Sequence, residues 1–313
     1  MDIITMPRDR ENVVRDIREF LVGAEQLPSP KGTAVQLMAI ARDPRAEVAD
    51  AVRVVKSDPA LAGFVLRAAN SARFGGMVKA VDLQRAVIRL GMNMIRVYAI
   101  TLSVMGEKPR QRCAEFDYAG FWTHALLSGL VAARLAGLRD GFPPEEAFSL
   151  GLLGSIGRLA FATAAPLEYG KLLLQQREAP SASLESLERV RFGFDHHELS
   201  AVLLVDWGLP SKLADVVYWQ FDPEAGGFPA HSREHDTAGA LQLAASVAEF
   251  SFQATVEPAQ VAAAYLRAAL LGLAPEEVRR ITAEALGELG TWSSLTGISV
   301  PTRALTPADW PDA

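Results

Sequence analysis

Apolar residues recur along most of the chain at intervals of three and four, the period of an α-helix with one buried face. The clearest stripe consists of Leu83, Val87, Leu90, Met94 and Tyr98. We find no run in which apolar and polar residues alternate as they do in a strand. The pattern therefore predicts an all-α protein of about a dozen helices joined by short linkers, without an internal repeat.

Several helix starts are marked by a capping residue or by a proline in the first turn. Asp58 can cap a helix that Pro59 opens, because proline is tolerated where the helix has no N–H partner. Residues 142–146, 208–211 and 274–277 carry similar signals, since each segment places proline beside small or acidic residues. These positions are expected to begin or separate helices.

Two segments lack the helical period. Residues 222–236 combine glycine, proline and charge, and we expect a loop there between the main body and the alanine-rich helices that follow. Residues 290–313 are expected to form an irregular tail. Trp292 and Trp310 are large apolar groups, so docking of this tail on the body is favoured over free disorder.

Composition narrows the possible chemistry. The 313 residues carry 31 Lys+Arg against 37 Asp+Glu, and the net charge of −6 argues against a general grip on nucleic-acid phosphates. One cysteine excludes an internal disulfide framework, and five histidines limit the choice of metal ligands. No secretory signal is visible, and the apolar stretch 259–274 is too short to span a membrane. We therefore expect a cytoplasmic protein without membrane contact.

Short motifs in a fixed order link the chain to a known family. They are SDPAL at 57–61, RAANSA at 67–72, AVIRLG at 86–91, FWTH at 121–124, AFSLGLL at 147–153, GFDH at 193–196 and DWGLP at 206–210. With these motifs, roughly residues 20–225 resemble the HDOD (HD-related output domain) family of bacterial signalling proteins, which is related to HD-domain phosphohydrolases. The resemblance implies an HD-like helical fold with a smaller N-terminal helical lobe.

This resemblance also suggests how the chain is divided. The expected parts are an N-terminal helical extension (1–19), the HDOD domain (20–225, with lobes of about 20–107 and 113–225), helices packed on that domain (226–289) and the tail (290–313). Neither a receiver domain nor a cyclic-dinucleotide enzyme domain is visible in the sequence. A partner of either kind would have to act in trans.

The metal site of the HD phosphohydrolases is expected to be degenerate here. Those enzymes hold a divalent ion with an early His, an adjacent His-Asp pair and a later Asp, because imidazole and carboxylate ligands anchor an ion that activates water. His124 matches the first ligand, but Gly154-Ser155 replace the pair and Ala245 replaces the late Asp. The resemblance thus implies no metal, no cofactor and no catalysis. The candidates for a relict pocket are His124, Gly154, Ser155, His196, Gln220 and Ala245.

Two histidine segments allow a functional and a structural interpretation. His124 can transfer protons or bind a ligand, or it can be a half-buried core residue with a hydrogen-bond partner. Residues 195–198 (DHHE) can clamp a metal or a phosphate. Alternatively, Asp195 caps a helix, His196 packs in the core and His197 is solvated, and we favour this structural interpretation.

Three further residues are expected to carry no special chemistry. His231 and His235 are four apart, which is a metal-ligand spacing on a helix, but they lie in the expected loop. Cys113 has arginines nearby and no evident His or Asn partner. We expect solvated histidines and an ordinary thiol.

A second candidate surface is the helix end formed by Asn70, Ser71, Arg73 and Phe74. Exposed polar groups and an aromatic ring on a rigid helix are typical of a recognition edge. The alternative is that Asn70 ties the smaller lobe together internally.

The leading functional hypothesis is a non-catalytic signalling module that acts by protein–protein contact. The resemblance suggests two-component kinases or receivers and cyclic-dinucleotide enzymes as partners, with no direct nucleic-acid binding. The alternatives are a residual metal-dependent phosphohydrolase and a nucleotide sensor that binds its ligand without turnover. The sequence leaves the oligomeric state open.

Overall fold

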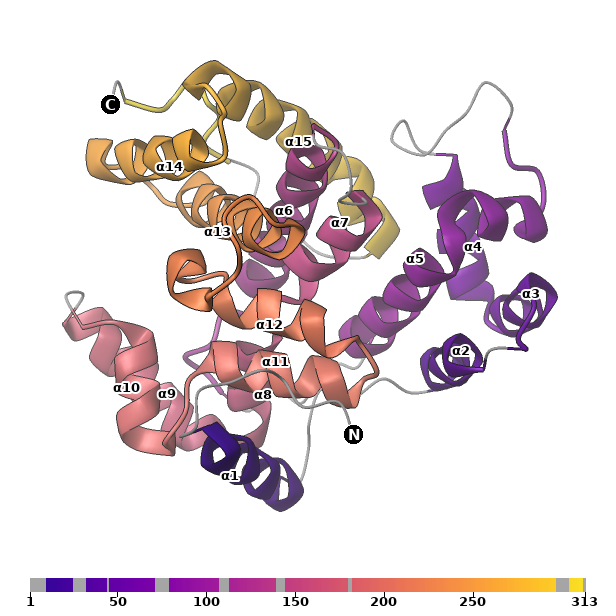
Figure 1. Cartoon of the computed structure of the whole chain (residues 1–313), viewed down its shortest axis with the longest axis horizontal. Helices are drawn as coiled ribbons and strands as arrows, with labels where there is room; N and C mark the ends of the chain where they lie inside the picture. Colours follow the sequence, from indigo (N-terminus) through magenta and orange to yellow (C-terminus); the bar gives the residue numbers. More distant parts are fainter. Residues whose placement is uncertain are drawn as a thin grey trace. The chain divides into compact units, whose positions relative to one another are not determined.

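A computed structural model describes most of the chain (Figure 1). The described residues are 10–24, 32–43, 45–70, 79–106, 113–138, 144–179, 182–296 and 304–311. Within these ranges every regular element is helical: fifteen α-helices and one short 3₁₀-helix. The predicted all-α fold is confirmed.

The helices group into two units, which we describe separately. One comprises residues 1–27, 109–293 and 298–313, and the other comprises residues 28–108 and 294–297. The larger unit begins with α1 (Arg10–Gly23), so this helix continues past residue 19, where we expected an N-terminal extension to end. The other predicted boundaries stay predictions.

The smaller unit consists of α2 (Thr33–Arg42), α3 (Val48–Lys56), α4 (Pro59–Ala69) and the long helix α5 (Leu83–Gly106). The predicted apolar stripe of α5 is buried at Val87, Leu90, Met94 and Tyr98. Each of the three shorter helices contacts α5. A kink interrupts α5 at Gly91, whose φ of 79° is strained for a residue with a side chain.

Asp58 forms the predicted start of α4. Its Oδ1 accepts the backbone N–H of Leu61 at 3.0 Å, and Pro59 is the first helical residue. Its Oδ2 accepts the hydroxyl of Thr33 at 3.0 Å, at the start of α2. One carboxylate therefore caps one helix and ties a second helix to it.

The larger unit is built around α6 (Tyr118–Ala136), which packs against α7 (Pro144–Leu153) and α13 (Arg233–Ser251). Two glycines allow α6 and α7 to approach closely. A Cβ on Gly151 would lie 2.8 Å from the Cα of Gly129, closer than real Cβ atoms come. The pair therefore fixes the distance between the two helices.

Further helices complete the larger unit: α8 (Ile156–Ala164), α9 (Pro166–Glu178), α10 (Leu184–Phe192), α11 (His196–Asp206), α12 (Ser211–Trp219), η1 (Pro223–Gly226), α14 (Pro258–Leu270) and α15 (Pro275–Thr296). Helices α11 and α12 pack side by side, as do α8 and α11 (Figure 1). Three predicted starts are confirmed, because Pro144, Ser211 and Pro275 are the first residues of α7, α12 and α15.

The segment expected to be a loop, residues 222–236, is partly helical. Pro223–Gly226 forms η1, and α13 already begins at Arg233. The helix starts there because the hydroxyl of Ser232 accepts the backbone N–H of His235 at 3.2 Å. The prediction of a continuous loop is wrong for these residues.

The start of the segment expected to be an irregular tail, residues 290–313, is helical. Helix α15 continues to Thr296, and the prediction is wrong up to that residue. The buried ring of Trp292 packs against Phe148 with a centroid distance of 4.8 Å. This apolar contact favours continued helix, because it keeps one face of α15 on the core.

Residues 304–311 confirm the predicted docking of the chain end. The N–H of Leu305 donates to the carbonyl oxygen of Ser251 at 2.7 Å. The buried ring of Trp310 meets Phe250 edge to face at 5.0 Å. Apolar burial and a backbone hydrogen bond therefore hold this segment on α13.

In the described part of the chain, one stretch has the length and hydropathy of a membrane-spanning helix: Glu146–Ala164, with 19 residues and a mean hydropathy of 1.4. Inside the protein 83% of its apolar window is buried, and a turn at 154–155 divides it into α7 and α8. This stretch forms core helices of the larger unit. The cytoplasmic location stays a prediction.

The close approach of α8 and α11 gives the first testable prediction. A Cβ on Gly157 would lie 2.1 Å from the carbonyl oxygen of His196, so we expect Gly157→Ala to lower the free energy of unfolding by about 3 kcal/mol. Gly287→Ala is the matched control, since Gly287 is exposed in α15 with nothing within 4 Å of its added Cβ, and alanine should gain up to about 1 kcal/mol there. Urea unfolding measures both, and equal effects would contradict the packing argument.

Candidate functional site

The relict-pocket residues lie in the larger unit, around the turn between α7 and α8. At this turn the side-chain amide of Gln220 donates to the carbonyl oxygen of Gly154 at 3.1 Å. A Cβ on Gly154 would lie 2.7 Å from the carbonyl oxygen of Leu150 and 3.1 Å from the Gln220 amide. A larger side chain therefore does not fit at position 154, and Gln220 fills the space beside it.

His124 projects from α6 toward α13. Its Nε2 lies 3.2 Å from the carbonyl oxygen of Ala245, and because a carbonyl oxygen only accepts, Nε2 carries the proton. Burial and the positive charge of Arg158 lower the pKa of His124 to about 4, although the hydrogen bond to Ala245 opposes this. The residue is half-buried and neutral, and its role stays a prediction.

A cavity of about 320 Å³ opens beside His124. Its polar lining includes His124, Ser155, Arg158, Arg177, Glu115 and Glu249. Arg177 also donates to the backbone carbonyl oxygen of Glu115 at 2.7 Å, so it is anchored at the rim. The cavity thus presents both signs of charge on rigid helices.

Arg158 is the central functional candidate that sequence reasoning missed. Burial opposes its charge, but the interactions with Tyr169 and with the carboxylates of Glu188 and Glu249 outweigh burial and raise the pKa of the guanidinium. Arg158 is therefore always a cation. The signal that could have revealed it is its spacing from Ser155. Arg158 follows Ser155 by three residues, about one helical turn, and both residues line the cavity.

The residues present do not fit the divalent ion of HD phosphohydrolases. Such an ion needs several imidazole and carboxylate ligands, whereas the matching positions hold Gly154, Ser155 and Ala245. The Nε2 of His124 is occupied by a carbonyl, and the fixed cation Arg158 lines the same cavity. Charge repulsion and the missing ligands both act against a metal ion at this position.

Behind the cavity lies a fully buried carboxylate, Glu188 of α10. Its Oε1 accepts the hydroxyl of Tyr169 at 3.0 Å. Its Oε2 accepts the backbone N–H of His196 at 2.9 Å and lies 2.7 Å from Nδ1 of the same residue. Burial lowers the pKa of His196, but Glu188 outweighs this and raises it overall. His196 is therefore tied to Glu188, and through Tyr169 to Arg158.

Asp195 caps α11, as the structural interpretation predicts. Its Oδ1 accepts the backbone N–H groups of His197 and Glu198, both at 2.9 Å. The Oε2 of Glu198 accepts the N–H of Asp195 at 2.9 Å, which completes a capping box. Arg189 forms an ion pair with Asp195, so the buried carboxylate is compensated.

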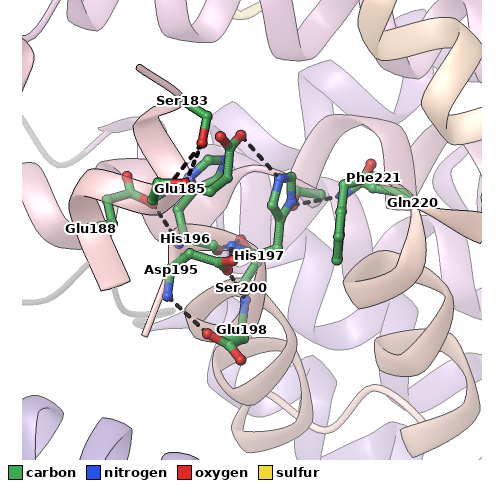
Figure 2. A network of polar contacts seen from close by, with 12 residues as sticks. Ser183, Glu185, Glu188, Asp195, His196, His197, Glu198, Ser200, Gln220 and Phe221 are labelled. Atoms are coloured by element: carbon green, nitrogen blue, oxygen red, sulfur yellow. Dashed lines mark hydrogen bonds and ion pairs between the residues drawn. The ribbon is translucent and has the colours of Figure 1, made fainter. Parts of the chain in front are cut away.

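His197 is buried, and the prediction that it is solvated is wrong (Figure 2). Its ring stacks on Phe221 at a centroid distance of 5.2 Å and lies 4.1 Å from the ring of His196. Its Nε2 is 3.7 Å from Oε1 of Glu185. Burial and the charge of His196 lower the pKa of His197, so it is neutral. An isolated helix pattern cannot reveal the Phe221 contact, because Phe221 follows a different helix.

The remaining single residues behave as ordinary groups. His231 is exposed, as predicted, but His235 is half-buried in the first turn of α13, and the prediction that it is solvated is wrong. Its Nε2 lies 3.1 Å from Glu224. Burial, more than any other influence, raises the pKa of the Cys113 thiol. A buried thiol with a raised pKa is a poor nucleophile, which confirms the expectation for this residue.

Asn70 ties the smaller unit together internally. Its Nδ2 donates to the carbonyl oxygens of Leu66 at 3.0 Å and Ala80 at 2.9 Å, and its Oδ1 accepts the N–H of Ala80 at 2.8 Å. These bonds join the end of α4 to the approach to α5. They support the structural alternative for Asn70. The other recognition-edge candidates, Ser71, Arg73 and Phe74, lie outside the described residues.

The structure places five of the six relict-pocket candidates in two groups. Gly154 contacts Gln220, and His124, which shares the cavity with Ser155, contacts Ala245. The sixth candidate, His196, does not line the cavity and reaches it only through its chain of charged partners.

Comparison with known proteins places the sequence motifs in context. The family model for the HDOD domain matches residues 27–223. A curated relative, an uncharacterized protein of Treponema pallidum (strain Nichols), is 24% identical over 196 residues, which is 62% of this chain. The chain spans only 37% of the length of that relative.

Two solved structures share the fold. A candidate phosphohydrolase from Shewanella amazonensis SB2B is 25% identical, with a TM-score of 0.67, and the match covers 88% of this chain and 97% of that one. An HDOD domain protein with unknown function from Geobacter sulfurreducens is 17% identical, with a TM-score of 0.70 and coverage of 91% and 98%. The second likeness is one of fold alone.

The lowered pKa of His124 predicts a loss of stability in acid. The unfolded chain takes up a proton near pH 6.5, whereas the folded protein does so only near pH 4, so stability present at neutral pH is lost as the pH falls through this window. At pH 5 the loss due to this residue should be about 2 kcal/mol. His124→Gln, which keeps an N–H donor, should remove that part of the acid sensitivity.

Urea unfolding at pH 7 and pH 5 measures the difference. The exposed His231 offers a matched control, because His231→Gln should leave the pH dependence as in the wild type. A pH dependence that is the same in all three proteins would show that His124 titrates normally.

Proposed function

Because the chain belongs to the HDOD domain family, we propose that it is a non-catalytic signalling module that acts by contact with partner proteins. The partners proposed are two-component kinases, their receivers, or enzymes that make or degrade cyclic dinucleotides. The family resemblance supports a regulatory role, and the acidic net charge of −6 supports a protein partner over nucleic acid.

The observation that carries the proposal is the guanidinium of Arg158 in the cavity beside His124. A metal-dependent hydrolase needs an ion with an open coordination position, which lowers the pKa of a bound water. A guanidinium brings positive charge but has no coordination position for water. With Gly154 and Ser155 at the ligand positions, the cavity lacks the means to generate a nucleophile.

We expect no hydrolysis of cyclic dinucleotides or nucleoside monophosphates above the buffer rate with Mn²⁺, Mg²⁺ or Fe²⁺. The reason is the missing ligand set around His124. Product formation by the wild type and by His124→Ala, followed by chromatography, measures this. Metal-dependent turnover in the wild type that His124→Ala abolishes would overturn the non-catalytic proposal in favour of a residual phosphohydrolase.

The partner itself is tested by cross-linking in the protein's own cells, followed by mass spectrometry and a binding titration with the purified candidate. We expect a signalling protein of the stated classes to bind. Phe74→Ala should weaken the complex by at least tenfold, because a truncated aromatic anchor costs about 2 kcal/mol. The exposed Gln84 on α5 supplies the control, Gln84→Ala. Equal affinity of both variants would remove the recognition edge from the proposal.

A further inference from the structure

Three side chains with metal-ligating atoms converge where the start of α10 meets the start of α11 (Figure 2). They are Glu185, His196 and His197, and one ligand atom of each lies within 4.8 Å of the other two. We propose that these residues bind a divalent transition-metal ion of the Zn²⁺ type, with water completing its coordination. None of the three lines the cavity beside His124, so this is a different place from the degenerate phosphohydrolase site.

The spacing of the ligand atoms supports a shared ion. The Nε2 of His197 and Oε1 of Glu185 are 3.7 Å apart, which is too long for a hydrogen bond. Two ligands of a tetrahedral Zn²⁺, each at about 2.0 to 2.1 Å, are separated by about 3.3 Å. A small movement of Glu185, whose side chain is 36% exposed, closes the difference.

His196 is already oriented as a metal ligand. Its Nδ1 lies 2.7 Å from Glu188, a carboxylate that Tyr169 and the backbone N–H of His196 also hold in place. Because Glu188 accepts the Nδ1 proton, the ion would take the place of the proton on Nε2. Zinc-binding histidines commonly have such a carboxylate partner, which fixes the tautomer and makes the imidazole a stronger ligand.

The imidazole of His197 is held in one position. The residue is 9% exposed, and its Nδ1, which is not the proposed ligand atom, is buried with no hydrogen-bond partner among the described residues. Stacking on Phe221 holds the ring in place, so little conformational entropy is lost when Nε2 binds an ion. A neutral, positioned imidazole beside a carboxylate is the donor set that Zn²⁺ prefers.

Charge and access also favour a cation. Glu185 and Glu188 bring two carboxylates to the cluster. The side chain of Glu188 is fully buried, whereas that of Glu185 is 36% exposed. The ion can therefore enter past Glu185 and keep one water. Arg158 acts on His196 with the opposite sign, but it faces Glu188, which compensates its charge.

The test uses the full chain, stripped of metal, and follows the visible absorption of added Co²⁺, with Zn²⁺ as competitor. We expect one Co²⁺ per chain with the intense band of four-coordinate cobalt, displaced by Zn²⁺, and a rise of the melting temperature with Zn²⁺. Glu185→Gln and His197→Ala should each weaken binding by about 100-fold. Because the side chain of Glu185 is partly exposed, Glu185→Gln tests the site even where His197→Ala is unstable.

Two controls decide the location. His235 is a half-buried histidine in the first turn of α13, beside Glu224 and Asp236, and His235→Ala should bind cobalt like the wild type. His124→Ala should also leave binding unchanged. Absence of stoichiometric cobalt, or binding that survives both site variants, overturns the proposal. Loss of binding in His124→Ala alone also overturns it and places the ion in the cavity.

Discussion

The larger unit depends on the compensation of one buried negative charge, the carboxylate of Glu188. A charge taken out of water costs several kcal/mol unless it is paired and hydrogen-bonded. Glu188, from α10, accepts the hydroxyl of Tyr169 from α9 and two N–H groups of His196 from α11, and Arg158 from α8 balances its charge. Four helices are therefore held to one point, and a change in any of these groups would leave the carboxylate with one partner fewer.

This compensation uses only side chains and backbone groups of the chain itself. In a metal-dependent hydrolase, the ion neutralises the acidic groups that surround it. Here the guanidinium of Arg158 supplies fixed positive charge that acts on both His124 and Glu188, and burial together with this charge lowers the pKa of His124 to about 4. The electrostatic balance around Glu188 is kept by a side chain, and the positions that match metal ligands hold Gly154 and Ser155.

Local signals were sufficient for the helices and their caps. The caps at Asp58 and Asp195 follow from side chains that bond to backbone within three residues, so the sequence contains the whole interaction. The roles of Arg158, Glu188 and His197 depend on partners from other helices. The helical period of the sequence identifies such residues only as polar. For His197 it therefore predicts contact with solvent, whereas in the structure the ring stacks on Phe221. The end of α15 could not be predicted for the same reason, because the contact of Trp292 with Phe148 on another helix keeps this segment helical.

Capping and metal binding are compatible within the four residues 195–198, because they use different atoms. The oxygens of Asp195 are taken by the backbone of α11 and by Arg189, and Glu198 bonds to the N–H of Asp195. Neither carboxylate remains for an ion. Capping nevertheless leaves the buried imidazole of His197 without a partner for Nδ1, at a cost of about 1 to 3 kcal/mol for the unsatisfied group. Stacking on Phe221 offsets part of this cost, but it does not account for a carboxylate that stops 3.7 Å from Nε2. The proposed ion would bridge Nε2 of His197 and Glu185 and use the orientation of His196, whereas Nδ1 of His197 would stay without a partner.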